Sequence, residues 1–329
     1  MSDPKHPHPR LQTQIAAVVY NPIKIDLDAV REVVQRKQVE QDWGETLWFA
    51  TSEDDPGQGP AREAHEAGAS MVIAAGGDGT VRAVAEGLQG TGVPMALLPS
   101  GTGNLLARNL KLTLDDLEHS VQTAFEGSDR KIDLGRIDIR HPDGSTTQHA
   151  FLVMAGLGLD AKMLANTDDD LKKKVGWLAY VRALSTTLRD KNQLRFRYSM
   201  NDGPARSIHA HTIIVGNCGA LPANILLLPD AAVDDGLFDI VLLRPEGFIG
   251  WVQIFAKVLW ENGVLRRTKW GRAIMTNEVS ALRYVKARNL TVKLERAEEI
   301  ELDGDGFGEA VGFKSWVDEG GLTVRVPAE

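Results

Sequence analysis

Cysteine is nearly absent from this sequence, because Cys218 is the only one among 329 residues. A single cysteine excludes an intrachain disulfide and a zinc site built from several cysteines, which suits a reducing compartment such as the cytosol. Cys218 follows Val215-Gly216-Asn217, a pattern typical of the end of a buried strand. We therefore expect a structural cysteine and not a nucleophile.

Long hydrophobic runs are also absent. No apolar stretch reaches the roughly 18 residues that a membrane-spanning helix needs, and the start of the chain has no apolar segment resembling a signal peptide. Prolines and polar residues predict a disordered tail over residues 1–14. We expect a cytoplasmic protein that reaches a membrane, at its inner face, only as a peripheral protein.

Basic residues are fewer than acidic ones. Lys and Arg number 37 against 45 Asp and Glu, which gives a net charge of −8. Nucleic-acid binding calls for a basic surface that neutralises phosphates, so this balance argues against a general nucleic-acid binder. The 43% hydrophobic and 25% charged content is that of a globular chain, and the length gives a prior of about two domains.

Two glycine-rich turns are the most informative stretches that are present. Met71–Ala75 is a short apolar run of buried-strand type, followed by the turn Gly76–Thr80 and a helical pattern; Met95–Pro99 and Ser100–Asn104 repeat the arrangement. Glycines let backbone N–H groups approach an oxyanion, and a helix N-terminus behind each turn favours phosphate. The pattern predicts a polyphosphate site at the carboxyl edge of a parallel sheet.

The usual nucleotide fingerprints are missing. No GxxxxGK[ST] stretch occurs, which excludes a P-loop because its lysine is lacking. The only GxGxxG/A match is Gly156–Ala161, and no acidic residue closes a following strand as a ribose contact would require. A nicotinamide dehydrogenase is therefore a remote alternative.

The order of the predicted elements indicates an α/β fold with a second, all-β part. Strands at 15–20 and 47–50 and helices at 27–34, 61–67 and 114–125 complete a doubly wound parallel sheet around the glycine turns. Later strands are predicted at 131–140, 148–155, 193–200, 208–215, 237–243, 282–286, 290–294 and 299–302. With few helices between them, these strands predict an antiparallel pair of sheets.

Two helical insertions interrupt the β region, at 171–188 and 248–260. For the first, an ordinary core-packed helix is the favoured interpretation. The second is followed by Arg266, Arg267, Lys269 and Arg272, interleaved with tryptophan. That composition suits an anionic lipid surface about as well as a solvated basic turn.

Several short blocks, in order, resemble the diacylglycerol kinase catalytic-domain family, especially its bacterial lipid kinases. The blocks are Asn21-Pro22, Thr51, GGDGT at 76–80, LPSGTGN at 98–104, IDLG at 132–135, GLGLDA at 156–161, PDA at 229–231, DDG at 234–236 and LDGD at 302–305. The resemblance implies an ATP-binding α/β domain over residues 15–130, completed by a return of about residues 320–329. It also implies a β-sandwich domain for the lipid substrate over residues 131–319.

The same resemblance implies an ATP- and Mg²⁺-dependent lipid kinase, with a diacylglycerol-like or sphingoid acceptor at a membrane surface and a role in lipid metabolism such as phospholipid biosynthesis. A homodimer is compatible with this interpretation. Together with the shared sheet edge, it predicts nucleotide contacts from Asn21, Thr51, Gly76, Gly77, Asp78, Gly79, Thr80, Arg82, Ser100, Gly101, Thr102, Asn104 and Asp133.

Three carboxylates are candidates for catalysis. Phosphoryl transfer to a lipid hydroxyl needs a base and a metal that screens the phosphates. By analogy with the family's DGE segment, Asp303 is the predicted general base, and Asp305 stands where the family usually has glutamate. Asp78, inside the first turn, makes sense beside phosphate if Mg²⁺ or water lies between them. The alternatives are a hairpin turn at Asp303-Gly304-Asp305 and a helix cap at Asp78.

A second metal site is implied by the resemblance. Several bacterial relatives bind a structural Mg²⁺ through the aspartate before glycine and neighbouring main-chain oxygens. This transfers to Asp235, with the carbonyls of Ala232 and Leu237. From the sequence alone, Asp234-Asp235-Gly236 is equally a β-turn.

Three departures from the family pattern distinguish this chain. Leu105 stands where many members have aspartate, Arg82-Ala83 replaces Asn-Glu, and Ile23-Lys24 replaces a glycine-rich sequence. Arg82 is a candidate phosphate contact in place of the missing carboxylate. The remaining alternatives are an NAD kinase, which shares the GGDG turn, and a non-catalytic nucleotide or lipid sensor.

Overall fold

A computed structural model describes residues 13–101, 103–158, 193–221, 225–226, 228–244 and 282–328 of the chain. Several sequence predictions lie outside these residues. They are Thr102, residues 159–161 of the GxGxxA match, the two helical insertions at 171–188 and 248–260 with the basic segment after the second, and residues 1–12 of the tail.

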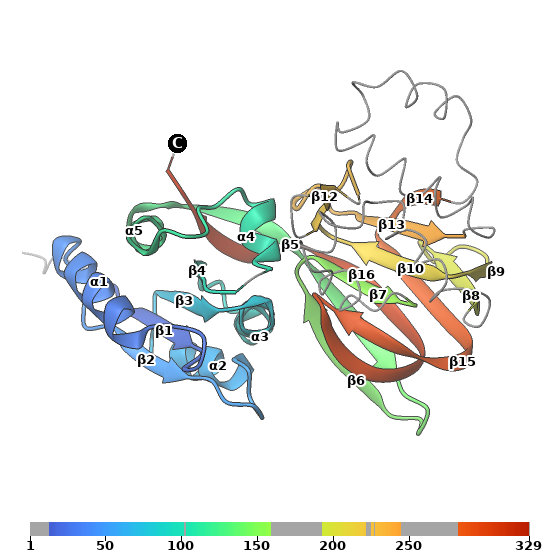
Figure 1. Ribbon diagram of the computed structural model, residues 1–329, viewed down its shortest axis with the longest axis horizontal. Coiled ribbons are helices and arrows are strands. Elements are labelled where there is room, and N and C mark those ends of the chain that lie inside the picture. The colour runs from blue at the N-terminus through green and yellow to red at the C-terminus, as the bar shows by residue number, and fades with distance from the viewer. Residues whose placement is uncertain are drawn as a thin grey trace, which may run out of the picture.

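The N-terminal part contains the predicted parallel sheet. Its strands are β1 (Ala16–Tyr20), β2 (Leu47–Ala50), β3 (Met71–Gly76) and β4 (Met95–Pro99). They pair in parallel in the order β2-β1-β3-β4 (Figure 1). Because all four strands run in one direction, the turns that follow them meet at one edge of the sheet.

Helices cover both faces of this sheet, which confirms the doubly wound prediction. They are α1 (Leu27–Glu40), α2 (Gln58–Glu66), α3 (Asp78–Leu88), α4 (Leu105–Asn109) and α5 (Leu117–Glu126). Alternate strand residues point to opposite faces. Ala17 and Val19 of β1 pack with α2, α3 and α4, whereas Ala16 and Val18 pack with α1 and α5.

The C-terminal part is antiparallel and forms the predicted β-sandwich. Its strands are β5 (Ser128–Arg140), β6 (Thr146–Phe151), β7 (Met154–Leu157), β8 (Leu194–Met200), β9 (Arg206–Ala210), β10 (Thr212–Gly216), β11 (Ala220–Leu221), β12 (Ile225–Leu226), β13 (Phe238–Leu243), β14 (Leu282–Ala287), β15 (Asn289–Leu302) and β16 (Asp305–Val326). A separate apolar core fills it, in which Phe151 and Phe238 stack with ring centroids 5.4 Å apart.

One strand joins the two parts. The first half of β16 pairs with β15, and β5 pairs with β16 from Gly312 onward. Near the end of β16, Val324 also pairs in parallel with Met95 of β4, so that a single sheet runs through the molecule (Figure 1). The two strands predicted at 290–294 and 299–302 are one strand, β15, whose pairing with β16 shifts register between Lys293 and Glu298. A local bulge therefore interrupted the alternation on which the prediction relied.

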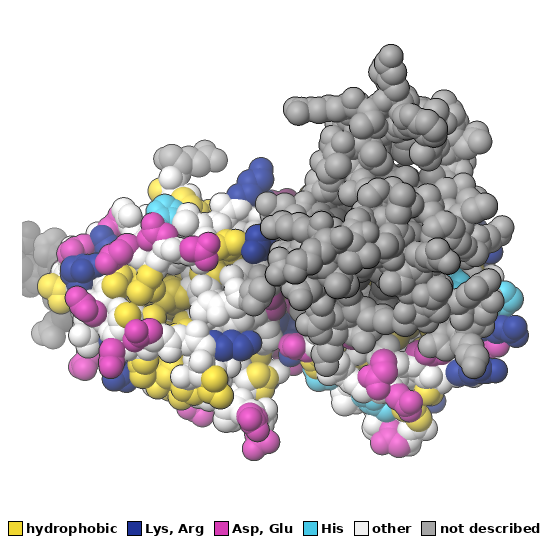
Figure 2. All heavy atoms as spheres, in the orientation of Figure 1, with side chains coloured by type: hydrophobic (Ala, Val, Ile, Leu, Met, Phe, Trp, Pro, Cys, Tyr) yellow, Lys and Arg dark blue, Asp and Glu magenta, His cyan; other side chains and the backbone are white. Residues whose placement is uncertain are grey.

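Two further expectations concern the surface and the cysteine. In the view of Figure 2, acidic and basic side chains are interspersed over the N-terminal part. None of the helices that the structure describes is long and apolar enough to cross a membrane. Cys218 is fully buried, its Sγ donates to the Leu152 carbonyl at 3.3 Å, and burial raises the pKa of the thiol.

Candidate active site

The two glycine turns lie against each other. They follow β3 and β4, which pair up to Gly76 and Pro99, and Ser100 N donates to the Gly76 carbonyl at 3.2 Å. A Cβ on Gly101 would stand only 3.1 Å from Cα of Gly77, so the close approach of the two backbones depends on glycine. Helix α3 begins at Asp78, within the first turn, and α4 begins directly after the second turn, so the N-terminal N–H groups of both helices lie at this edge.

Asp78 links the first turn to the second. Its Oδ1 accepts a hydrogen bond from Leu105 N, the first residue of α4, at 2.6 Å, and its other oxygen crowds the space beside Gly103. Asp78 thus caps α4, and not its own helix α3, whose N-cap Gly77 offers no side chain. Burial raises the pKa of Asp78 against the backbone hydrogen bonds from Leu105 and Asn104, and the charge of Asp305 raises it further.

Asp305 reaches the first turn from the β-sandwich. A Cβ on Gly79 would lie 2.6 Å from Asp305 Oδ2, and the Asp305 side chain is 52% exposed. The carboxylate therefore lies directly against the turn while keeping access to solvent. The loop-forming residues before it explain its position, because Asp303 (φ 51°) and Gly304 (φ 91°) form a tight two-residue turn between β15 and β16.

Arg82 occupies the space between the turn and the sandwich. Its guanidinium lies 3.9 Å from Asp305, 3.4 Å from Glu86 and 4.5 Å from the centre of the Phe307 ring, and the residue is only 4% exposed. Its buried Nε has no hydrogen-bond partner among the residues that the structure describes. A buried cation with an unused donor is suited to an anionic ligand.

Asp303 is buried beside this group, with 5% of its surface exposed. Its Oδ2 accepts from Leu152 N at 2.8 Å, and its Oδ1 accepts from Val153 N at 2.8 Å and Met154 N at 2.9 Å. Burial raises the pKa of Asp303 to about 6, although the three backbone hydrogen bonds and the Arg82 charge oppose the rise. A carboxylate has about four lone-pair positions, so one remains after these three bonds.

Lys24 was not among the predicted site residues. Its Nζ stands 3.0 Å from the place a Cβ on Gly77 would take, which sets the ammonium over the first turn. The side chain is exposed, and among the residues that the structure describes it forms no hydrogen bond or ion pair. Its place in the first βα loop, two residues after Asn21-Pro22, was the sequence signal that could have pointed to it.

The remaining polar candidates surround the turns in different ways. Asn21 and Thr51 follow β1 and β2 at the same edge; Asn21 Oδ1 accepts from Ile23 N at 3.0 Å, and Thr51 is buried. Thr80 is buried against Gly76. Ser100 Oγ is buried without a hydrogen-bond partner in the described part of the chain.

Asn104 closes the second turn upon itself. It has left-handed backbone angles (φ 48°, ψ 47°), its Oδ1 accepts from Gly101 N at 3.1 Å, and its Nδ2 donates to the Gly101 carbonyl at 2.7 Å. The side-chain amide of Asn104 therefore stabilises the turn. A nucleotide that contacts this amide has to share its oxygen or nitrogen with the backbone of Gly101.

Asp133 and Asp235 lie outside this group. The buried Asp133 carboxylate accepts from Gly236 N at 2.7 Å and Gly320 N at 2.8 Å, so both of its oxygens fix loops of the sandwich. Asp235 Oδ2 lies 3.0 Å from Nζ of Lys286. The structure brings neither of the two carboxylates to the glycine turns.

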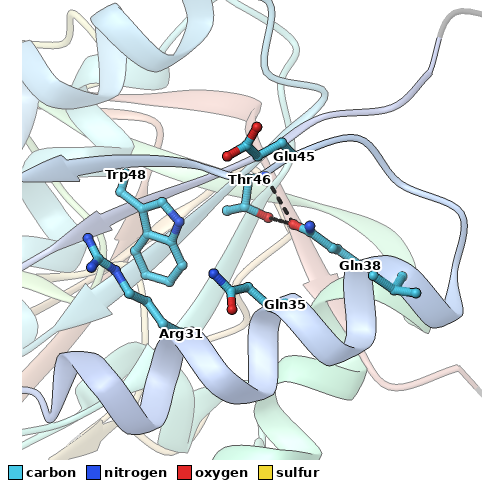
Figure 3. Close-up of a pocket in the computed structure, with 7 residues that line it drawn as sticks. Arg31, Gln35, Gln38, Glu45, Thr46 and Trp48 are labelled. Carbon is cyan, nitrogen blue, oxygen red and sulfur yellow. Dashed lines mark hydrogen bonds between the residues drawn. The ribbon is translucent and has the colours of Figure 1, made fainter.

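A surface hollow lies away from the glycine turns. A hollow of about 640 Å³ lies between α1 and the edge strand β2, with Arg31 stacked 5.1 Å from the Trp48 ring centre (Figure 3). Its lining residues are Arg31, Gln35, Gln38, Val39, Glu45, Thr46 and Trp48. None of these is a predicted site residue.

Comparisons with known proteins agree with this arrangement. The family model described as diacylglycerol kinase catalytic domain matches residues 16–137, and that described as YegS C-terminal NAD kinase beta sandwich-like domain matches residues 153–315. A "Probable lipid kinase YegS-like" of Pseudomonas aeruginosa is 32% identical over 284 residues, covering 84% of this chain and 83% of that protein.

Two further similarities extend over nearly the whole length. A "Diacylglycerol kinase" of Bacillus subtilis is 25% identical over 301 residues, covering 89% of this chain and 90% of that one. The crystal structure of a putative diacylglycerol kinase from Bacillus anthracis superposes with a TM-score of 0.70 at 18% identity, covering 95% of this chain and 97% of that one. At that identity the superposition shows the fold.

Proposed function

This chain belongs to the diacylglycerol kinase catalytic-domain family of lipid kinases, and from that premise we propose that it transfers the γ-phosphoryl group of ATP to a lipid hydroxyl. The α/β domain, residues 15–130 with about 320–329, binds the nucleotide. The β-sandwich, residues 131–319, presents a diacylglycerol-like or sphingoid lipid taken from a membrane surface.

One observation carries the proposal: groups from both domains converge on the first glycine turn. Asp305 reaches Gly79 from the sandwich, and Arg82 and Lys24 flank the turn from the α/β domain. Backbone N–H groups at Gly77–Thr80 receive the phosphate oxygens, the N–H groups of Gly101 and Asn104 join them by exchanging their bonds to Asn104 Oδ1 and Asp78, and the two cations offset the phosphate charge. Catalysis of phosphoryl transfer rests mainly on such positioning and charge stabilisation.

Asp303 takes the proton of the lipid hydroxyl. A base works best with a pKa near the working pH, and burial has moved the pKa of Asp303 to about 6. Its three backbone hydrogen bonds fix the carboxylate in place and leave one lone pair for the incoming proton. The lipid oxygen then forms a bond to the γ-phosphorus of ATP while the bond from that phosphorus to the β,γ-bridging oxygen breaks, and ADP leaves with the negative charge on that oxygen.

Asp305, together with the Asp78 oxygen that does not accept from Leu105 N, would hold a Mg²⁺ ion that accompanies the nucleotide. Their negative charges interact unfavourably, since the charge of Asp305 raises the pKa of Asp78, and Asp305 stays half exposed against the turn. Carboxylate oxygens of this kind are preferred Mg²⁺ ligands together with phosphates. When bound, the ion screens the charge that develops on the transferred group.

The experiment is a transfer assay with γ-labelled ATP and purified protein. The acceptors are diacylglycerol, a sphingoid base and phosphatidylglycerol in detergent micelles, with NAD as the acceptor expected of an NAD kinase. We expect label in one lipid class. Label in NAD alone would show that the acceptor is a ribose hydroxyl and not a lipid. ATP binding without transfer to any acceptor would favour a non-catalytic sensor.

Matched variants separate turnover from folding. Asp303→Asn removes the base, and turnover should fall about 10²- to 10⁴-fold while ATP still binds. Asp143→Asn makes the same change in the exposed hairpin between β5 and β6, away from the glycine turns, and should leave turnover unchanged. Unchanged turnover in Asp303→Asn would exclude Asp303 as the base.

A further inference from the structure

A lysine lies at the centre of the loop where the family resemblance predicts a structural Mg²⁺. Nζ of Lys286 donates to the Asp230 carbonyl at 2.8 Å and to Asp235 Oδ2 at 3.0 Å, and it lies 3.2 Å from Asp239 Oδ2. These oxygens come from both ends of the loop between β12 and β13 and from β13 itself. One ammonium thus gathers three oxygen atoms from a ten-residue stretch.

Strand pairing places the lysine there. Lys286 of β14 is the direct antiparallel partner of Asp239 of β13. Opposite charges on directly paired residues stabilise such a pair. The Asp239 side chain is 7% exposed, whereas that of Lys286 is 37% exposed, so the aliphatic stem covers the acid while the head reaches the loop. A buried carboxylate at this position requires a cation beside it.

The residues of this loop do not fit Mg²⁺. Both oxygens of Asp235 already have partners, because Oδ1 accepts from Leu237 N at 3.1 Å and Oδ2 binds Lys286. Mg²⁺ demands six oxygens at about 2.0–2.1 Å, and an ammonium in the middle of the donors repels a second cation.

The neighbouring acid is also neutralised by the protein. Arg130 of β5 donates to Asp234 Oδ2 at 2.7 Å, so the two adjacent aspartates of this loop each have a cation of their own. The next residue, Gly236, donates its N–H to Asp133, which also binds Gly320 of β16. The loop therefore connects β14 to β5 and, through Asp133, to β16.

We propose that the Lys286 ammonium is the resident cation of the 230–239 loop and that it makes this loop independent of a divalent metal. The predicted Mg²⁺ site at Asp235, with the carbonyls of Ala232 and Leu237, is replaced by a side chain of the protein itself. This inference is independent of the acceptor and of catalysis, since none of these residues contacts the glycine turns.

The first test compares the wild-type chain with Asp235→Asn without nucleotide. Thermal unfolding is followed in EDTA, in Mg²⁺ and in Ca²⁺, and bound Mn²⁺ is counted by electron paramagnetic resonance. We expect both proteins to respond equally to each ion and to bind the same number of Mn²⁺ ions. A metal-dependent rise in Tm, or a bound Mn²⁺, that Asp235→Asn abolishes would overturn the proposal.

The second test measures the coupling between Lys286 and Asp235. Lys286→Met should raise the unfolding equilibrium constant by at least about tenfold, because it leaves Asp239 without its cation. In the double variant with Asp235→Asn, the second change should cost less than it does alone. Arg130→Met, which breaks a pair that is 43% and 46% exposed, is the matched control and should change the constant only a few-fold.

Additive effects of Lys286→Met and Asp235→Asn would contradict the proposal, and so would a Lys286→Met protein as stable as the wild type in EDTA. If Lys286→Met does not fold, the wild-type and Asp235→Asn comparison decides the question alone. The thermal unfolding and Mn²⁺-binding measurements of that comparison require only the wild type and Asp235→Asn.

Discussion

Asp303 should make the stability of the protein depend on pH in a direction opposite to that of an ordinary surface carboxylate. Its pKa is about 6 in the folded chain against 3.8 for an unperturbed aspartate, because burial penalises the ionised form. The folded state therefore holds the proton more tightly than the unfolded state. The stabilising contribution is fully present below pH 3.8 and is lost as the pH rises through 6.

The size of this effect follows from the two pKa values. By proton linkage, the contribution of Asp303 to the free energy of unfolding falls by about 2 kcal/mol between about pH 4.5 and 7.5, and most of the change comes before about pH 6.5. Asn at this position cannot ionise. The new side chain in Asp303→Asn would also place its amide N–H₂ group against a backbone N–H that now donates to the carboxylate. The loss of that hydrogen bond lowers the free energy of unfolding by about 1–3 kcal/mol at every pH.

The assay is chemical denaturation of the wild type and Asp303→Asn across this pH range. The difference between their unfolding free energies isolates the ionisation of Asp303 from all other titrations. Asp305→Asn, in the same hairpin but with a side chain that is 52% exposed, makes the same substitution at a site that is not buried and is the control for the substitution itself. A difference that is flat or that grows with pH would refute the reasoning, since the three backbone donors would then outweigh burial.

The remaining predictions concern the first glycine turn. Lys24→Met should raise the KM for ATP about tenfold or more, through loss of a charged phosphate contact, with the ATP-independent stability unchanged. Gly79→Ala places a methyl group 2.6 Å from Asp305 Oδ2, and turnover should fall roughly 10²-fold as the carboxylate moves away, with native circular dichroism. Arg82→Lys keeps the charge but loses the planar contact with Phe307, so calorimetry should show a loss of about 1 kcal/mol and the labelled-ATP assay a slower turnover. Normal kinetics in any of these variants would remove that residue from the proposed site.

The sheet edge of the site was predictable because it rests on local signals. Short apolar runs followed by glycine give β3, β4 and their turns, and parallel pairing then forces the turns together. The same logic located Asn21 and Thr51. Contacts between distant segments were not accessible in this way: Asp78 bonds to Leu105, 27 residues later, and Asp303 bonds to the backbone at Leu152–Met154, about 150 residues earlier.

The position of a residue in a family motif said least about its function where its side chain forms all of its hydrogen bonds or ion pairs within the protein. Asp133 belongs to a family block, but its two oxygens hold Gly236 and Gly320, which no sequence spacing reveals. Lys286 is 51 residues from Asp235, and only the register of β13 against β14 brings it to that loop. Lys24 was noted in the sequence as a departure from the family pattern. Its place in the site depends on how the first βα loop positions the ammonium over Gly77, which the sequence does not give.

The passage of β16 through both domains has a consequence for synthesis of the chain. Arg325 and Val326 pair with the beginning of β5, and Val324 pairs with Met95 of β4, a strand made more than two hundred residues earlier. While the ribosome is still producing the sandwich, the edge of the first sheet at β4 lacks the strand β16 that will pair with it. Such an open edge pairs readily with other strands, so we expect the nascent chain to be prone to aggregation at β4 until residue 324 has left the ribosome.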